Sequence, residues 1–353
     1  MSQHPQAPCV GIIANPVSAR DIRRVIANAS NLQTADRVNI VLRMLTVFAS
    51  LGVPRVLMMP DKGGVRAMLL RHLRRESNLH NKFPVLEFLD FDPASTVDDT
   101  LRAAREMRAA GVKAIIVLGG DGTHRAVVRE CGDIPIAGLS TGTNNAFPEM
   151  RESTITAMAV ALYATGKLSA AQALAPNKLL DVSINSGERS DIAIVDAVIS
   201  TERFVGARAL WKAESLAAVY LSFADPQAIG LSSIGGLLHP VGRQEHGGLA
   251  VQLTEHPTQR QLTLSAPIAP GMMRDIGIAH WEPMRAGRDF EVPVSAGVVA
   301  LDGEREMAFD RTDRVTVTLR KNAFFTVDVA RCLQTAAQLG LLRHPAPQTT
   351  KET

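Results

Sequence analysis

Residues 119–123 read Gly-Gly-Asp-Gly-Thr and place one carboxylate among three glycines. The apolar run Val112 to Leu118 before them predicts a buried parallel strand, and Arg125 to Glu130 after them predicts a helix. Backbone N–H groups at a helix N-terminus bind anions, and glycine leaves room for a phosphate to approach them. We therefore expect a phosphate group to bind at Gly119, Gly120, Gly122 and Thr123.

Asp121 is the unusual member of this loop, because a carboxylate repels phosphate. It is useful there if it holds a magnesium ion or takes the proton of an attacking hydroxyl, as in phosphoryl transfer. The alternative is that Asp121 only caps the following helix and the glycines only form a turn. The loop by itself leaves both interpretations open.

A second glycine-bearing loop follows the next predicted strand. Ile134 to Leu139 is again apolar, and it is followed by Ser140-Thr141-Gly142-Thr143-Asn144-Asn145. After Pro148, a long helix is expected from about Thr154 to Thr165. Parallel strands carry their carboxyl-end loops on one edge of the sheet, where open α/β sheets bind ligands. The two loops should therefore form one crevice.

The elements around both loops predict an α/β domain with a parallel sheet over residues 8–150. The other strands are expected at Cys9 to Ala14, Arg55 to Met59 and Pro84 to Phe88. Helices are expected at Asp21 to Ala29, Ala35 to Leu51, Arg66 to Arg75 and Val97 to Ala110. Gly111 is a natural stop for the last of these helices.

From about residue 178 the sequence changes to short β-rich segments, which predicts a mostly antiparallel β domain over residues 151–328. Strands are expected at Leu180 to Asn185, Asp191 to Ser200, Leu249 to Thr254, Arg260 to Ala266, Asp275 to His280, Val298 to Leu301, Arg314 to Leu319 and Phe324 to Val329. One helix, Gly206 to Phe223, is expected to interrupt them. A last helix over residues 329–342 should pack on the first domain, and residues 343–353 should be a disordered tail.

Composition and charge argue against several classes of protein. The net charge is +3 and the arginines are scattered, so no nucleic-acid partner is expected. No apolar run reaches the ~18 residues of a membrane span, so we expect a cytoplasmic protein without a membrane partner. Cys9, Cys131 and Cys332 form no CxxC pair, and His124 is interpreted as a lone, solvent-facing residue at a helix start. Neither a disulfide nor a metal site built from these residues is predicted.

Four stretches resemble motifs of one kinase superfamily, in order along nearly the whole chain. Residues 119–123 match the Gly-Gly-Asp-Gly-Thr motif of NAD kinases, diacylglycerol kinases and sphingosine kinases. Asn15 to Ser18 resembles the Asn-Pro-x-Ser loop that approaches the nucleotide, Thr141 to Asn145 resembles the lipid-kinase Gly-Thr-Gly-Asn-Asp loop, and Leu301 to Glu304 resembles the late Asp-Gly-Glu element. Residues 15–24 and 143–148 are most similar to the ATP-NAD/AcoX kinase family.

This resemblance implies a Rossmann-like domain, a β-sandwich after it and an active site between them. It implies ATP with Mg²⁺, or polyphosphate, as the phosphate donor, NAD as the default acceptor, and a homo-oligomer, either a dimer or a tetramer. Asp121 and Glu304 become the candidate catalytic residues. Nucleotide contacts beside the glycine loop are expected from Asn15, Ser18, Thr141, Gly142, Thr143, Asn144, Asn145, Asp196, Asp302 and Gly303.

Two departures from the related kinases concern the substrate. NAD kinases carry an asparagine before an acid in the segment that matches Ala193 to Ile199, whereas this chain has Val195 before Asp196. An amide that contacts a base cannot be replaced by an isopropyl group without losing its hydrogen bonds. The second loop ends in Asn145, where lipid kinases have an aspartate.

The sequence leaves the acceptor open. NAD is one candidate, and a small polyol or an acetoin-related metabolite is another. A nucleotide-binding regulatory protein of acetoin catabolism, without turnover, is the alternative from a different class. A lipid kinase at a membrane surface is a further alternative, although no amphipathic basic helix with exposed aromatic residues is found. Glu304 and Asn15 also have a plainer interpretation as turn residues, beside Asp302-Gly303 and Pro16.

Overall fold

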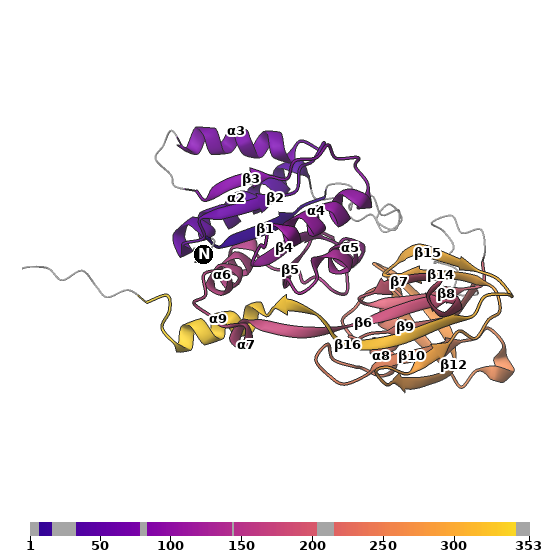
Figure 1. Ribbon diagram of the computed structural model, residues 1–353. Coiled ribbons are helices and arrows are strands. Elements are labelled where there is room, and N and C mark those ends of the chain that lie inside the picture. The colour runs from indigo at the N-terminus through magenta and orange to yellow at the C-terminus, as the bar shows by residue number, and fades with distance from the viewer. Residues whose placement is uncertain (1–6, 16–32, 78–82, 143–144, 203–214, 344–353) are drawn as a thin grey trace, which may run out of the picture.

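The computed structural model describes residues 7–15, 33–77, 83–142, 145–202 and 215–343 (Figure 1). An α/β domain, drawn from indigo to magenta, is followed by a domain of mostly antiparallel strands that includes the orange segments. Each domain has an apolar core of its own. Among the described helices, none combines the length and the apolar character that crossing a membrane requires.

The α/β domain is built on parallel strands in the order β3-β2-β1-β4-β5. These strands are β1 Cys9–Ile13, β2 Arg55–Met58, β3 Val85–Phe88, β4 Ala114–Gly119 and β5 Ile136–Ser140. The helices are α2 Thr34–Leu51, α3 Val65–Ser77, α4 Val97–Ala109, α5 Asp121–Cys131, α6 Ser153–Ala164 and α7 Ala170–Ala173. Because side chains alternate between the faces of a strand, α2, α3 and α6 pack on one face of the sheet while α4 and α5 pack on the other.

Local sequence explains where α4 begins and ends. The Thr96 hydroxyl accepts a hydrogen bond from the Asp98 N–H, and the Asp99 carboxylate reaches back to the Thr96 N–H in a capping box. After the helix, Gly111 takes φ +67°, a conformation that glycine adopts without strain. The predicted helix and its predicted stop are therefore both present.

α6 packs with the α/β domain, because its side chains join the same core as those of α2. The helix is apolar on most of its surface, and Ala157, Val160 and Ala161 are fully buried in it. The boundary predicted between residues 150 and 151 lies before this helix. In the structure, the strands of the second domain begin with β6.

Two long strands, β6 Leu174–Ile184 and β16 Val315–Val327, run side by side from the α/β domain into the second domain (Figure 1). β16 is parallel to β5 at one end and antiparallel to β6 along its length. The ladder is irregular between Arg320 and Phe324, where Asn322 has φ +51°. The two strands predicted at residues 314–319 and 324–329 are therefore one strand that carries the sheet across the junction.

The second domain is a β-sandwich, as the family resemblance implied. One layer contains the far ends of β6 and β16 with β7 Arg189–Ala193 and β13 Asp289–Glu291. The other layer has the order β11-β12-β10-β9-β8-β14-β15. Its strands are β8 Asp196–Ser200, β9 Leu216–Leu221, β10 Gly248–Leu253, β11 Leu262–Ala269, β12 Met272–Met284, β14 Gly297–Leu301 and β15 Glu304–Phe309, with the 3₁₀ turns Asn185–Gly187 and Pro257–Gln259 between strands. Val182 and Leu319 of the first layer meet Ile199 and Val299 of the second in the core.

Two predictions for this domain are wrong. Leu216 to Leu221, predicted as part of a helix, form the central strand β9, which is buried along its whole length. Alanine and leucine favour helices, but pairing with β8 and β10 decides the outcome here. Residues 191–200 form two strands rather than one, because the chain leaves the first layer after β7 and enters the second at β8. The short helix α8 Ser232–Leu238, which covers the outer face of the second layer, was not predicted.

The last helix, α9 Val329–Gln338, packs on the α/β domain beside α6 and α7 (Figure 1). Asp328 caps it by accepting a hydrogen bond from the Arg331 N–H at 3.0 Å. Val329, Cys332 and Ala336 join the core around α2 and α6. The helix predicted at residues 21–29 and the tail predicted to be disordered after residue 343 lie outside the described residues.

Candidate active site

The Gly-Gly-Asp-Gly-Thr segment is the junction of β4 and α5. β4 ends at Gly119, Gly120 is the N-cap, and α5 begins at Asp121, so the helix starts earlier than its apolar pattern predicted. Gly120 has no side chain that could cap the first N–H groups of the helix. A helix N-terminus of this kind, with the positive end of the helix dipole, is suited to an anion.

At Gly119 and Gly120, neighbouring side chains of the protein itself leave no room for a Cβ atom. A Cβ on Gly119 would lie 2.6 Å from the Cβ of Thr123. A Cβ on Gly120 would lie 2.6 Å from the Oδ1 of Asn145. These glycines were predicted to leave room for a phosphate, but Thr123 and Asn145 already lie close to the backbone on these sides.

Asp121 fixes the second loop against the first. Its two carboxylate oxygens accept hydrogen bonds from the N–H groups of Ala146, at 3.0 Å, and Phe147, at 2.9 Å. The residue lies inside the first turn of α5 and Gly120 is the cap, so the capping interpretation of Asp121 is wrong. The two glycine-bearing loops therefore meet at the carboxyl ends of β4 and β5.

The second loop is held together by its own polar groups. Asn145 donates from Nδ2 to the Ser140 Oγ at 2.8 Å and to the Gly142 carbonyl at 3.3 Å. The Thr141 N–H donates to the Gly119 carbonyl of the first loop at 3.4 Å. The Thr141 hydroxyl is buried and has no hydrogen-bond partner in the described part of the chain. Because such burial is costly, this hydroxyl is the group of the loop that a ligand oxygen would satisfy.

Asp302 lies on the second domain's side of the two loops. Its carboxylate accepts hydrogen bonds from the N–H groups of Ile194, Val195 and Asp196 at 2.9, 2.8 and 3.1 Å. These N–H groups form the bend at which the chain passes from one sheet to the other. Asp302 and Gly303, with φ +50° and +79°, form the turn between β14 and β15. Asp302 was predicted to contact the nucleotide. Its carboxylate instead binds the backbone N–H groups of this bend.

The charges of the predicted acids act on one another. Burial raises the pKa of the Asp302 carboxyl well above its ordinary value, and the nearby Arg125 guanidinium opposes that rise. The negative charges of Asp196 and Asp121 raise the same pKa further. Asp196 is itself only 8% exposed. Asp121 of the first domain and Asp196 of the second thus both lie within electrostatic range of Asp302.

Two arginines of α5 connect the glycine-loop helix to the second domain. Arg125 is 4% exposed, and its guanidinium lies 3.4 Å from the Asp191 carboxylate and 3.8 Å from that of Asp302. Arg129, one helical turn later, lies 3.2 Å from the same Asp191 carboxylate. The spacing of four residues puts both arginines on one helix face, but the sequence did not identify their partners. They fix α5, and the loop before it, relative to the β-sandwich.

His124 is fully buried, so the prediction that it faces solvent is wrong. Its Nδ1 lies 2.8 Å from the Gly120 carbonyl, and its ring packs beside that of Phe147 with 5.7 Å between the centroids. A Cβ on Gly138 of β5 would lie 2.8 Å from its Nε2, which has no hydrogen-bond partner among the described residues. Burial lowers the pKa of His124 to about 4, so the ring is neutral at pH 7. His124 follows the glycine loop in the sequence, but its side chain packs against Gly138 of β5.

The remaining predicted contacts are only partly described. Asn15, after β1, is 3% exposed and donates from Nδ2 to the Thr96 carbonyl and the Thr100 hydroxyl, both at 3.0 Å. It therefore holds the start of α4. Glu304 opens β15. The predicted contacts Ser18, Thr143 and Asn144, and the side chain of Glu304, lie outside the described part of the structure.

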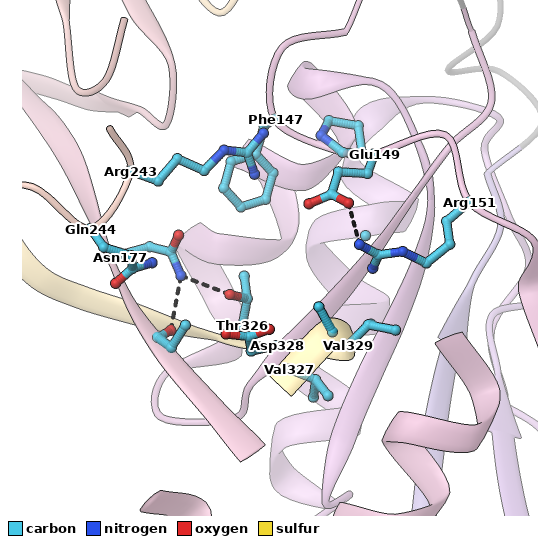
Figure 2. A pocket seen from close by; sticks show the side chains of 14 residues that line it. Phe147, Glu149, Arg151, Asn177, Arg243, Gln244, Thr326, Val327, Asp328 and Val329 are labelled. Atoms are coloured by element: carbon cyan, nitrogen blue, oxygen red, sulfur yellow. Dashed lines mark hydrogen bonds and ion pairs between the residues drawn. The ribbon is translucent and has the colours of Figure 1, made fainter. Parts of the chain in front are cut away.

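Arg243, which the sequence analysis did not identify, reaches these loops from the turn before β10. Its guanidinium lies over the rings of Phe147 and Phe223, at 5.1 and 4.7 Å from their centroids, and donates to the Ala146 carbonyl at 2.6 Å. Figure 2 shows the side chain extended over the Phe147 ring. Burial lowers the pKa of Arg243, while the charges of Glu149 and Asp121 oppose that change. A cation of the second domain is thus placed next to the loop that Asp121 holds.

Acetoin catabolism protein X of Cupriavidus necator is 63% identical over 340 residues, which cover 96% of this chain and 94% of that protein. The chain belongs to the ATP-NAD/AcoX kinase family. Within this family, residues 10–167 match the ATP-NAD kinase N-terminal domain, and residues 178–322 match the acetoin catabolism protein X C-terminal domain. The resemblance seen in the motifs is confirmed.

Two solved structures match over most of the chain. The structure of yeast NADH kinase complexed with NADH is 13% identical, covers 99% of this chain and 95% of its own, and gives a TM-score of 0.47. A putative diacylglycerol kinase from Bacillus anthracis is 12% identical, covers 91% of this chain and 97% of its own, and gives a TM-score of 0.45.

The position at which this AcoX-family chain departs from NAD kinases lies in an apolar cluster. Val195 is 1% exposed and packs in one cluster with Phe147 and Phe223. Its backbone N–H is taken by Asp302 and its carbonyl accepts from the Ser222 N–H. The isopropyl group is therefore part of the packing between the second loop and the β-sandwich.

Proposed function

We propose that this family member transfers a phosphoryl group from ATP, or from polyphosphate, to a hydroxyl group of NAD or of a related small metabolite. The observation that carries the proposal is the meeting of the two glycine-bearing loops, with the Asp121 carboxylate between them. The first N–H groups of α5 suit the phosphates of the donor. The orphaned Thr141 hydroxyl adds a donor on the second loop.

Asp121 is the proposed catalytic residue. It would orient the acceptor hydroxyl and take its proton while the new P–O bond forms and the bond between phosphorus and the leaving phosphate breaks. The N–H groups of Ala146 and Phe147 fix the direction of its carboxylate and favour its charged form. Glu304, at the start of β15, is the second proposed catalytic residue because of its place in the Asp-Gly-Glu element.

The donor set around the loops fits Mg²⁺ that arrives with a nucleotide. Mg²⁺ usually binds one or two carboxylates together with substrate phosphates and water, not an all-protein cage. Among the described residues, no group of three His, Cys, Asp or Glu side chains is placed to hold a metal, while the charges of Asp121 and Asp196 both act on Asp302. Bound there with the donor, Mg²⁺ would be held by Asp121 and would neutralise phosphate charge.

A nucleotide-binding protein without turnover is the second candidate function. Val195 favours it, because a buried isopropyl group stands where NAD kinases have an amide. An acceptor that depended on that amide would lose its hydrogen bonds here. A regulatory protein would use the same fold and the same nucleotide loops. It would need no catalytic carboxylate.

ATP consumption in the presence of Mg²⁺ tests the proposal, with NAD, NADH, small polyols and acetoin as acceptors. The wild type, Asp121→Asn and a matched control, Asp61→Asn, are compared. Asp61 also accepts two backbone hydrogen bonds, from the N–H groups of Val65 and Arg66 at 3.0 and 2.7 Å, but at the start of α3. The control therefore reproduces the structural cost of the substitution away from the two loops.

We expect turnover with one acceptor, a loss of about 10²- to 10⁴-fold in kcat for Asp121→Asn, and a change below about twofold for Asp61→Asn. Equal losses in both variants would show that Asp121 acts through stability alone. Calorimetric binding of ATP or NAD(H) without product from any acceptor would favour the regulatory candidate instead.

A further inference from the structure

Two neighbouring cavities lie along β6 and β16 where the domains join, and we call them together the junction groove. One, of about 220 Å³, lies between the second loop and the start of α9; it is lined by Phe147, Glu149, Thr326 and Asp328, among others. The other, of about 450 Å³, is lined by Pro176, Met284, Arg285 and Lys321, among others. Asn177, Arg243 and Gln244 belong to the walls of both. Figure 2 shows Arg243 above the first cavity and Thr326 and Asp328 below it.

The second cavity of the junction groove has a cationic wall. Arg243, Arg285 and Lys321 line it, and none of the three forms an ion pair in the described part of the chain. Glu245 is the acid of this wall, and its carboxylate accepts a hydrogen bond from the Gly242 N–H at 3.1 Å. The wall therefore carries three cations without a carboxylate at ion-pair distance in the described residues, while Glu149, Asp121 and Asp225 act on Arg243 from farther away.

Arg243 is the most buried of these free cations. A guanidinium has several N–H donors, but within the described residues Arg243 makes one hydrogen bond, to the Ala146 carbonyl. The rings of Phe147 and Phe223 cover it at cation–π distance. Taking a charge out of water without a paired anion is costly, which is consistent with the lowered pKa of this residue. The remaining donors of the guanidinium suit the planar, two-oxygen face of a phosphate or a carboxylate.

Lys178 fixes the turn that carries Arg243. Its ammonium donates to the carbonyls of Gly242, Glu245 and Gly247 at 3.0, 2.8 and 2.7 Å. The three bonds join β6 to residues 242–247, so the backbone of the turn cannot move without breaking them. The guanidinium is therefore held in place before a ligand arrives, which lowers the entropic cost of binding.

We propose that the junction groove binds a small molecule that carries an oxyanion, either a phosphate or a carboxylate, with Arg243 as its charge partner. Phe147 lines the first cavity and its N–H donates to the Asp121 carboxylate, so the groove adjoins the loop that holds the proposed catalytic carboxylate. If the protein has the proposed function, the acceptor bound in the groove is an anion rather than a neutral polyol. The binding itself does not depend on phosphoryl transfer.

Isothermal titration calorimetry without ATP tests the groove with three probes. Pyrophosphate stands for a nucleotide-like ligand, D-glycerate for a small hydroxy acid, and glycerol for the neutral polyol of the same carbon number. The wild type is compared with Arg243→Gln and with Arg66→Gln as the matched control. Arg66 also lies over a phenylalanine ring, that of Phe88 at 4.9 Å, but on α3, away from the groove.

We expect the wild type and Arg66→Gln to bind at least one of the two anions and not glycerol. Arg243→Gln should bind that anion about 10- to 100-fold more weakly, the loss expected for a charge-assisted contact. Tighter binding of pyrophosphate would identify a nucleotide-like ligand, and tighter binding of D-glycerate a small acid. Either result supports the proposal.

The proposal is overturned if the wild type binds neither anion, if glycerol binds as well as D-glycerate, or if Arg243→Gln and Arg66→Gln lose affinity equally. Should Arg243→Gln fail to fold, Lys321→Gln at the exposed rim of the groove replaces it, with an expected loss of about two- to threefold; unchanged affinity in that variant also overturns the proposal. A protein that binds the anion by calorimetry but shows no ATP consumption would leave the groove intact and remove the kinase proposal alone.

Discussion

The glycine-loop edge and the junction groove satisfy their charged groups in different ways. At the glycine-loop edge, the Asp121 and Asp302 carboxylates accept backbone hydrogen bonds and Arg125 lies between two acids. In the groove, Arg243 has aromatic rings and one carbonyl around it but no acid within ion-pair distance in the described residues. The charged side chains of the first region have their partners within the protein, whereas Arg243 in the second is paired by a ligand.

This difference separates the residues that build the site from those that select what binds there. The motif residues hold the two loops and the two domains in place, so substitutions among them should reduce stability as well as activity. Arg243, Arg285 and Lys321 of the groove form no ion pair in the described part of the chain, so substitutions of these three should change affinity more than stability.

Replacing Arg125 with methionine should give the largest loss of stability. The change leaves the buried Asp302 carboxylate without its cation and leaves Asp191 with Arg129 alone, and breaking a buried ion pair in this way costs about 3–5 kcal/mol. The control is Arg129→Met, whose side chain is 42% exposed and whose ion pair with Asp191 should contribute less than about 1 kcal/mol. Urea unfolding at pH 7 measures both; similar losses in the two variants would mean that Arg125 is not the connection between the domains.

His124 should make the protein lose stability in mild acid. Its pKa is about 4 in the folded protein and about 6.5 when unfolded, so the unfolded chain binds more protons between these values. Stability from the neutral ring is complete above pH 6.5 and is lost as the pH falls through 4; at pH 5 the loss should be about 2 kcal/mol. Urea unfolding at pH 7 and pH 5 should show this loss in the wild type and in a control, His239→Asn, at an exposed histidine. A loss of the same size in His124→Asn would contradict the assignment.

The fold was predictable where local pattern and long-range pairing agree. The apolar runs before both glycine loops gave the parallel strands β4 and β5, and the capping residues of α4 gave that helix its start. Leu216 to Leu221 show the opposite case, because their alanines and leucines fit a helix as well as a strand. Only the neighbours β8 and β10, distant in the sequence, make this segment a strand.

The site was predictable only as far as the motifs reach. The order of the motifs placed Asp121 beside the second loop, and the two are in contact. Arg243 could not be found in this way, since its hydrogen-bond partner Ala146 is 97 residues away. His124 was predicted to face solvent because it stands near the start of a helix, but its side chain faces β5. Burial and ion pairing of single side chains depend on the packing of the domains, which local spacing does not encode.

Gly120→Ala should cost about 1 kcal/mol and should do so through Asn145. The new methyl group would lie 2.6 Å from the Asn145 Oδ1, while Gly120 itself has an extended φ of −96° that alanine adopts easily. A double-mutant cycle with Asn145→Ala isolates this contact, and we expect the cost to fall mostly away in that background. An undiminished cost would assign the glycine to the helix cap and not to the packing of the two loops.

The smallest effect expected is a pH dependence of anion binding in the junction groove. Burial lowers the pKa of Lys178 to about 8, with Glu245 opposing the change, so its ammonium loses its proton as the pH rises above 8. The three carbonyl bonds that fix the turn of Arg243 then weaken. Affinity for D-glycerate, which stays ionised over this range, should fall about threefold from pH 7 to pH 9.

Lys178→Met separates this effect from any other titration in the groove. The variant should bind D-glycerate weakly at both pH values, because its turn lacks the ammonium at either. A wild-type affinity that does not change with pH, or a decline of equal size in Lys178→Met, would show that Arg243 is held by the phenylalanine rings alone. Arg243 would then select the ligand without the help of Lys178, and β6 would have no part in holding its guanidinium.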